Sequence, residues 1–181
     1  MSRSVRNCAV CVTGGAGFLG SHMVNHLIED RNCKVLVIDN LCAGRREHIH
    51  PDAKFVHADI TVSESFLCRL FDKYDTKYVF SYAAWPYIPD SFDRPAHVCG
   101  VNFTGAMNVI NAAADAECEG ILQVSSAEIY GEDHNAPGST HRGTTSMTGK
   151  IGEGFPVTPR SSYGASKAAI DAYVQARWRE A

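Results

Sequence analysis

Hydrophobic and polar positions along the chain form two alternating kinds of segment. Five short runs are nearly all apolar inside, namely CAVCVTG (8–14), KVLVID (34–39), KFVHAD (54–59), KYVFSYAA (77–84) and GILQVSS (120–126). Apolar runs of this length, bounded by turn or charged residues, are typical of parallel strands covered by helices on both faces. The pattern therefore predicts five buried strands.

Helical spacing appears between these runs. Apolar and aromatic positions from Phe18 to Leu27 recur at the spacing of an amphipathic helix, and further helices are predicted over 63–74, over 95–117 and from 161 to the end. A β-α-β order with right-handed crossovers predicts an α/β fold with a doubly wound parallel sheet, the Rossmann fold, in one domain over 1–181. The stretch 131–160, rich in Gly, Thr, Ser and Pro, is expected to be a long functional loop.

Composition narrows the partners. The chain has 181 residues, 45% of them hydrophobic, and 17 Lys and Arg against 20 Asp and Glu give a formal net charge of −3. With no basic block, neither nucleic acid nor an anionic membrane is an expected partner. The N-terminus resembles neither a signal peptide nor a membrane span, so a cytoplasmic protein is expected. A small neutral or anionic ligand fits this balance better.

Seven cysteines are scattered along the chain, an odd number that fits reduced core thiols better than a disulfide framework. Cys8 and Cys11 form a C-x-x-C motif. Both are expected inside the first buried strand rather than at a helix N-terminus, which argues against a redox or metal site there. No metal is expected.

A glycine-rich stretch, VTGGAGFLGSH, directly follows the first predicted strand. It contains Gly14-x-x-Gly17-x-x-Gly20 and, by overlap, Gly15-x-Gly17-x-x-Gly20, and it opens an amphipathic helix. Glycines there make the tight turn and let backbone N–H groups approach a pyrophosphate at the helix N-terminus. The order of strand, turn and helix predicts a dinucleotide site rather than a turn that binds nothing.

The carboxylate at the end of the second strand indicates which dinucleotide binds. Asp39 lies at the right distance along the chain to accept hydrogen bonds from the ribose hydroxyls of an adenosine. Its charge repels a 2′-phosphate and so favours NAD, although Arg45 and Arg46 leave room for NADP. Asp59, after the third strand, is a candidate contact for adenine, and a helix cap explains it nearly as well.

At this level of detail the chain resembles the nucleotide-sugar epimerase/dehydratase branch of the extended short-chain dehydrogenase/reductases. The stretches TGGAGFLGSH, VIDNLCAGRREHI, FVHADI, VFSYAAWPYIPDSFDRPAHVCGVNFTGAMNVI, VSSAEIYG and SSYGASKAA occur in the family's order and span nearly the whole chain. One departure is Pro86, where some epimerases carry a lysine.

The resemblance implies a cofactor-binding set, residue by residue. The pyrophosphate is then lined by Gly14, Gly17, Phe18 and Leu19; the adenosine ribose is held by Asp39 and Asn40; Asp59 and Ile60 flank adenine; Tyr82, Ala83 and Ala84 pass beside the cofactor; and Asn102 fixes the sheet and a bound water or the cofactor edge.

The resemblance also implies a catalytic set of Ser126, Tyr163 and Lys167. Tyr163 acts as general acid/base, Lys167 assists it and contacts the nicotinamide ribose, and Ser126 hydrogen-bonds the same substrate hydroxyl. Taken alone, a Tyr and a Lys four residues apart describe many solvated helix faces. A free tyrosine titrates near ~10, and nearby positive charge favours its phenolate.

The reaction implied begins with removal of a hydroxyl proton and a hydride from one sugar carbon, which yields a keto-sugar. Epimerisation is the leading outcome. Family dehydratases carry an Asp-Glu pair after the Ser or Thr, whereas this chain has Ala127-Glu128, and Glu128 keeps a dehydratase or UDP-glucuronate decarboxylase open.

The chain ends at Ala181, within the helix that carries Tyr163, whereas family members continue well beyond that point. The substrate-binding lobe for a nucleotide-diphosphate sugar is therefore expected to be missing, through truncation or because this is a fragment. A non-catalytic NAD-binding module is the alternative from another class.

The resemblance further implies a homodimer that packs the helix over 95–117 and the helix from 161 onward against their two-fold mates. The small-residue faces NAAADA and SKAAIDAY permit close approach of these helices.

Overall fold

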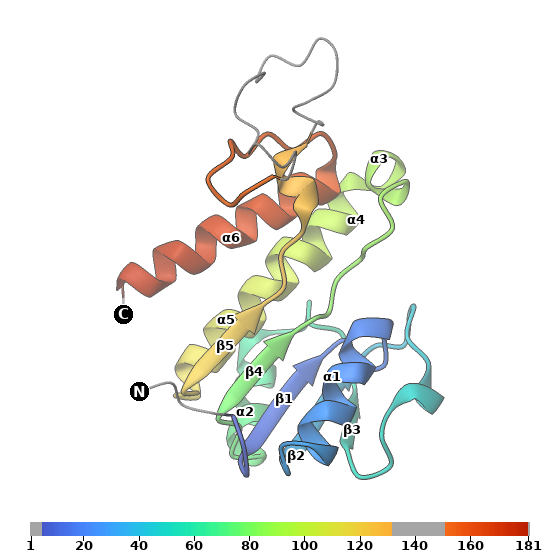
Figure 1. Cartoon of the computed structure of the whole chain (residues 1–181), viewed down its shortest axis with the longest axis vertical. Helices are drawn as coiled ribbons and strands as arrows, with labels where there is room; N and C mark the ends of the chain where they lie inside the picture. Colours follow the sequence, from blue (N-terminus) through green and yellow to red (C-terminus); the bar gives the residue numbers. More distant parts are fainter. Residues whose placement is uncertain (1–4, 132–150, 181) are drawn as a thin grey trace.

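The computed structural model describes residues 5–131 and 151–180, and within them a five-stranded parallel sheet forms the centre of the fold (Figure 1). The strands are β1 (Ala9–Thr13), β2 (Lys34–Asp39), β3 (Lys54–His57), β4 (Tyr78–Ser81) and β5 (Gly120–Gln123). Their order across the sheet is β3-β2-β1-β4-β5, and every neighbouring pair is parallel. The predicted doubly wound sheet is confirmed.

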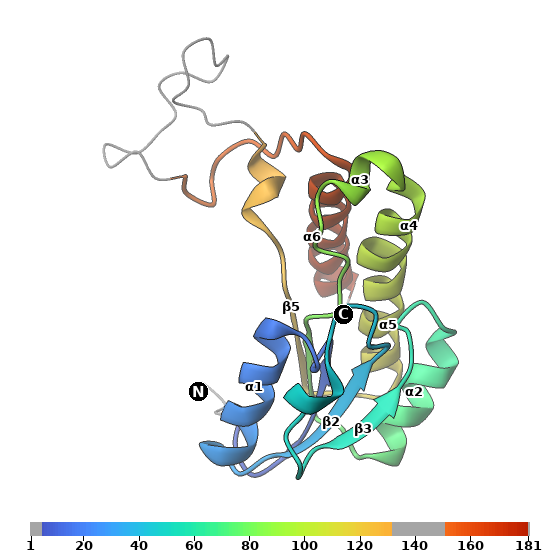
Figure 2. The same ribbon diagram turned by 90° about the vertical axis from the view of Figure 1, so that its right-hand side faces the viewer.

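The central strands are apolar because both of their faces are covered. Val10 and Val12 pack on one face with Val24 and Leu27 of α1 (Phe18–Glu29). Cys11 and its neighbours in β2 and β4 pack on the other face, against α2 (Glu64–Lys73) and α5 (Ala106–Asp115). Figure 2 shows α1 on one side of the sheet and α2 and α5 on the other. Burial on both faces accounts for the absence of polar alternation within these strands.

The helix predicted over 95–117 is present, but it is not uniform. It consists of α4 (Pro95–Cys99), a π-helical segment labelled η2 (Gly100–Gly105), and α5, and it is preceded by the short helix α3 (Asp90–Asp93). A π-helical turn inside a longer helix often accompanies a functional site. Here it carries the buried Asn102.

The last helix, α6 (Ser162–Glu180), begins one residue later than predicted. It packs against α4, η2, α5 and the 3-10 turn η3 (Ala127–Tyr130), and its Ile170 is buried with Ala106 and Ile110. A second 3-10 turn, η1 (Arg46–His48), follows β2. In the predicted loop over 131–160, the described residues 131 and 151–160 form turns and irregular structure, and the remainder lies outside the described residues.

Several expectations concern chemistry away from the sheet edge. All seven cysteines lie in the described part and are unpaired. Cys11 lies within β1, but Cys8 precedes it, because the strand begins at Ala9. Over 5–131 and 151–180 there is no group of three or more His, Cys, Asp or Glu side chains arranged to hold a metal ion. None of the helices in those ranges is long and apolar enough to span a membrane.

Candidate functional site

A cavity of about 600 Å³ lies at the carboxyl ends of the strands, where ligands bind in doubly wound folds. It is bounded by the glycine turn after β1, the ends of β2 and β3, the segment after β4, and α6. Most of the predicted residues line it: Gly14, Gly17, Phe18, Leu19, Asp39, Asn40, Asp59, Ile60, Tyr82, Ala83, Ala84, Tyr163 and Lys167. Asn102 and Ser126 are not part of its lining.

The glycine turn is built for close backbone contact. Gly14 has a φ of 71°, and a Cβ at this position would lie 2.7 Å from the backbone nitrogen of Ala83. Gly17 is the N-cap residue of α1, so no side chain caps the helix, and the first turn of α1 has no acidic residue. The positive end of the helix dipole is therefore left for an anion, as in dinucleotide sites.

Asp39 joins the glycine turn to the end of β2. Its Oδ2 accepts a hydrogen bond from the Ala16 amide (3.0 Å) and its Oδ1 accepts one from the Leu41 amide (2.8 Å). The side chain is 8% exposed and lines the cavity. Two carboxylate oxygens offer about four acceptor sites, so lone pairs remain for ribose hydroxyls.

Asn40 and Asp59 form a second polar pair beside it. The Asn40 amide donates to Asp59 Oδ2 (2.7 Å), while Asp59 Oδ1 accepts from the Thr61 amide and hydroxyl, each at 2.8 Å. Partial burial acts to raise the pKa of Asp59, but the hydrogen bonds from Thr61 and Asn40 outweigh it, so the pKa lies below its usual range. Asp59 is therefore a charged group that both shapes this loop and faces the cavity.

Asn102 acts on the backbone of the cavity wall. It is 1% exposed, its Oδ1 accepts from the Trp85 amide (2.7 Å) and its Nδ2 donates to the Trp85 carbonyl (3.1 Å). The two bonds fix the chain just beyond β4. Asn102 thus holds the segment that lines the cavity, and its predicted contact with the cofactor stays a prediction.

The catalytic end of the cavity depends on how closely α6 approaches η3. A Cβ at Gly164 would lie 2.6 Å from the Glu128 carbonyl oxygen, so only glycine permits this contact. The contact brings Tyr163, which lines the cavity, to the chain that carries Ser126. The hydroxyl of Ser126 accepts a hydrogen bond from the Glu128 amide (3.2 Å), whereas the adjacent Ser125 lines the cavity and donates to Asp171 (2.5 Å).

Lys167 is buried, with 3% of its surface exposed, and its Nζ donates to the Val124 carbonyl at the end of β5 (2.9 Å). Burial lowers its pKa from the usual value, and the nearby charge of Asp171 partly opposes that change. A lysine in this position keeps its ammonium group at the cavity floor, one helical turn from Tyr163. It is the charge that the predicted role for Tyr163 requires.

Other lining residues were not foreseen, among them Trp85, His97, Val101, Val124 and Ser125. Val124 and Ser125 lie at the carboxyl end of the fifth predicted run (120–126) and directly after β5, so the rule that ligands bind at the carboxyl ends of strands could have found them. His97 and Val101 lie in α4 and η2, and no local pattern marks which side of those helices meets the cavity.

A parallel α/β sheet with a glycine turn, a carboxylate after the second strand and a Tyr/Lys pair at its carboxyl edge defines a Rossmann-type dinucleotide-binding domain. The chain matches the NAD dependent epimerase/dehydratase family over residues 10–181, and it belongs to that family. Because this family depends on NAD, NAD is the cofactor that the cavity residues are expected to hold.

Individual relatives are consistent with this membership. The chain is 34% identical over 161 residues to a UDP-glucose 4-epimerase of Lactobacillus helveticus, covering 87% of this chain and 43% of that protein. It is 33% identical over 178 residues to the dTDP-D-glucose 4,6-dehydratase of Homo sapiens, covering 94% and 47%. A solved UDP-glucose 4-epimerase of Thermus thermophilus in complex with NAD has a TM-score of 0.81 at 32% identity, covering 95% of this chain and 51% of that one. The chain spans about half the length of the curated relatives it matches.

The residues present fit NAD. The uncapped start of α1 suits a pyrophosphate, and Gly14 and Gly17 line the cavity beside it. Asp39 retains acceptor sites for ribose hydroxyls. Arg45 and Arg46 do not line the cavity: Arg45 pairs with Glu47 (3.6 Å) and Arg46 lies over the Phe55 ring (4.5 Å). These two contacts favour NAD over NADP.

The burial of Lys167 predicts a pH-dependent contribution to stability. Because its pKa is lower in the folded than in the unfolded chain, the folded state releases its proton first. The unfolding free energy of the unsubstituted chain should therefore rise, relative to Lys167→Met, as the pH increases through the lowered pKa towards about 10.4. Urea unfolding at a series of pH values measures this difference. A difference independent of pH across that range would contradict it, and Lys54→Met, at an exposed strand position, is the control.

Proposed function

We propose that this chain is the NAD-binding and catalytic part of a nucleotide-sugar epimerase that works through a transient keto-sugar. The observation that carries the proposal is the placement of Tyr163 and Lys167 on the same cavity as the glycine turn and Asp39. Relatives named UDP-glucose 4-epimerase support this substrate class. Those relatives are about twice as long as this chain. The epimerase activity is therefore proposed for a whole protein that contains this domain.

The residues divide the chemistry as follows. Tyr163 takes the proton of a sugar hydroxyl as its phenolate and later returns it as the phenol. The Lys167 ammonium favours the phenolate by its charge, and its bond to the Val124 carbonyl holds it at the cavity floor. The family resemblance assigns Ser126 to the same hydroxyl; its oxygen accepts from the Glu128 amide and its O–H remains able to donate, although the residue lies outside the cavity lining. NAD, which the glycine turn and Asp39 would hold, would supply a reversible hydride acceptor for the carbon that bears this hydroxyl, as inversion of that carbon requires.

A dehydratase is the second candidate, because relatives that share a third of the sequence bear that name. Elimination of water needs a proton donor for the leaving hydroxyl. Ala127 stands where family dehydratases carry an aspartate, and this favours epimerisation. Glu128 is the residue that leaves dehydratase and decarboxylase chemistry open as alternatives. The contacts of Glu128 with Ser126 and Gly131 are made by its backbone and not by its carboxylate.

A non-catalytic NAD-binding module is the alternative from another class. The presence of Ser126, Tyr163 and Lys167 together argues against it, since a cofactor sensor does not need a proton-transfer group.

We also propose that the protein is cytoplasmic, because seven unpaired thiols are chemically stable in that compartment.

The chain should bind NAD more tightly than NADP. A 2′-phosphate would lie against the Asp39 carboxylate, which is anchored by two amides and cannot turn away. Calorimetric titration with each cofactor measures the two dissociation constants. Asp39→Asn removes the charge but leaves one oxygen for the two amides, so it should weaken NAD binding and narrow the difference between the two cofactors by roughly tenfold. NADP binding as tight as NAD binding in the unsubstituted chain would contradict the prediction.

In a full-length protein that contains this chain, Tyr163→Phe should abolish turnover and leave the dissociation constant for NAD within a factor of about two, because it removes only the hydroxyl that transfers the proton. Products from UDP-glucose, UDP-N-acetylglucosamine, UDP-glucuronate and dTDP-glucose, each assayed separately, are identified by NMR. A C4 epimer supports the epimerase. A 4-keto-6-deoxy sugar or a pentose would replace it with the dehydratase or the decarboxylase, and turnover by Tyr163→Phe would contradict the assigned proton acceptor. Tyr87→Phe, at an exposed position outside the cavity, is the matched control.

We also propose that the protein is a homodimer that packs α4 to α5 and α6 against their two-fold mates. Phe103, Met107, Tyr173 and Val174 are only partly buried at the junction of these helices, which leaves apolar surface for a partner. Sedimentation velocity over a concentration series should show a dimer. Met107→Glu should shift the distribution to the monomer, and a monomer at every concentration of the unsubstituted protein would contradict the proposal.

A further inference from the structure

The segment after β4 carries a tryptophan that the proposed reaction leaves without a role. Trp85 lines the cavity between Ala84 and Pro86. It is half-buried, and it belongs to none of the three hydrophobic clusters that stabilise the fold. Packing in the core therefore does not explain why a large aromatic side chain occupies this position.

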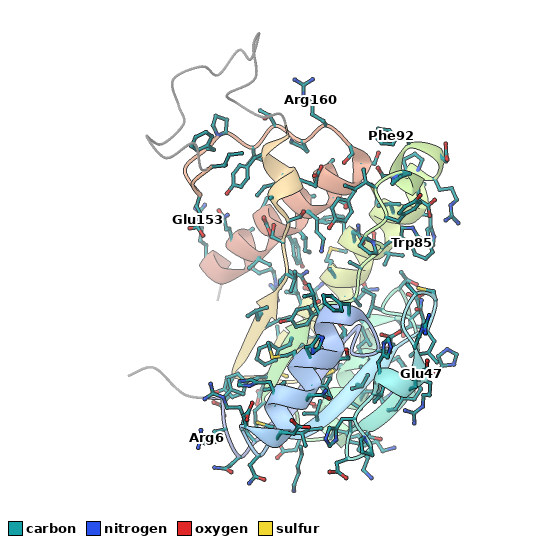
Figure 3. All side chains as sticks on the ribbon, turned by 45° about the vertical axis from the view of Figure 1, so that its right-hand side comes forward. Arg6, Glu47, Trp85, Phe92, Glu153 and Arg160 are labelled. Atoms are coloured by element: carbon teal, nitrogen blue, oxygen red, sulfur yellow. The ribbon has the colours of Figure 1, made fainter. Side chains whose placement is uncertain are left out.

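Contacts on several sides hold the indole in one orientation. Its Nε1 donates to Asp90 Oδ2 (2.8 Å), and the Arg94 guanidinium donates to the same oxygen (2.5 Å). The Arg94 guanidinium also lies 5.2 Å from the centre of the indole, and the His97 ring meets it edge-on at 4.8 Å. Figure 3 shows Trp85 on the segment that leads from the sheet towards α3, where Phe92 is labelled.

Asp90 and Arg94, beside the indole of Trp85, carry opposite charges and form an ion pair. Hydrogen bonds from Arg94 and Trp85 lower the pKa of Asp90, so its carboxylate stays charged and keeps both donors at neutral pH. Asn102, as described above, fixes the backbone of Trp85 at its amide and its carbonyl. A side chain restrained at both its backbone and its ring loses little further freedom when a ligand packs on it.

Strand order shows which part of the cavity Trp85 faces. β4 lies between β1 and β5. The backbone of Ala83, two residues before Trp85, touches the glycine turn after β1, and Val124, after β5, holds Lys167. The chain that carries Trp85 therefore leaves the sheet between the glycine turn and the strand that leads to the Lys167 contact. Asp39 ends β2 and Asp59 follows β3, and both of these strands lie on the far side of β1 from β4.

We propose that Trp85 is a positioning residue for the nicotinamide half of NAD, held by Asp90, Arg94 and His97 as a rigid aromatic wall on which the nicotinamide riboside packs. The inference rests on the proposed function, because it takes NAD as the occupant of the cavity. An indole is a large, rigid apolar surface, and a tryptophan side chain has only two rotatable bonds. Such a surface suits packing against the planar nicotinamide ring and its ribose. Because His97 also lies within electrostatic range of Asp59, the candidate adenine contact, the test must separate the two halves of the cofactor.

The experiment compares NAD with ADP, which lacks the nicotinamide riboside. Dissociation constants for both are measured by calorimetry on the unsubstituted chain, Trp85→Leu, Trp85→Phe and Asp90→Asn. Trp85→Leu should weaken NAD binding roughly tenfold and leave ADP binding unchanged. Trp85→Phe should retain most of the NAD affinity, because an aromatic face remains. Asp90→Asn should weaken NAD alone, by roughly threefold, because the indole loses its charged anchor.

The control is Phe92→Ala. This aromatic residue of α3 is 67% exposed and does not line the cavity, so its loss should change neither constant. Equal weakening of NAD and ADP by Trp85→Leu and Trp85→Phe would show a general change in cavity shape and overturn the inference. An unchanged NAD constant in Trp85→Leu would also overturn it. Failure of the unsubstituted chain to bind NAD would contradict the proposed function itself, and the inference with it.

Discussion

The close approach of two backbone segments at the carboxyl edge of β1 is the constraint on which the rest of the site depends. Gly14 touches the backbone of Ala83, at a separation that any side chain would prevent. Because of that contact, the glycine turn, the start of α1 and the segment after β4 meet at one point. The turn can then present the N-terminal amides of α1 to the cavity, which the segment after β4 also lines.

Polar side chains stabilise the loops around this point rather than facing solvent freely. Asp39 connects the glycine turn to β2, Asn40 connects the β2 loop to Asp59, and Asn102 holds the backbone of Trp85. Each group satisfies backbone or side-chain donors that would otherwise be costly to bury. Asp39, Asn40 and Asp59 also line the cavity, whereas Asn102 does not. Their orientation is therefore set before any ligand arrives, which reduces the entropy lost on binding.

The catalytic end is organised by a second close contact, between Gly164 and the backbone of η3. It brings the start of α6 to the chain that follows β5, so that Tyr163 and Lys167 reach the cavity while Ile170, one turn further along, remains in the core. Lys167 is buried, although burial disfavours its charge. A position that lowers the stability of the charged form and is nonetheless occupied by lysine is typical of a functional site.

Local pattern was sufficient for the strands, for most helix boundaries and for the residues near the glycine turn, because parallel strands buried on both faces are visible as apolar runs and the turn has strict glycine requirements. Asp39 followed from its distance along the chain. The partner of Asn102, which is the backbone of Trp85, the absence of Ser126 from the cavity lining, and the cluster around Trp85 were decided only by the tertiary structure. Each depends on which side of a helix or turn meets a segment distant in sequence. That orientation is set by packing between elements, which the period of hydrophobic residues in one element does not encode.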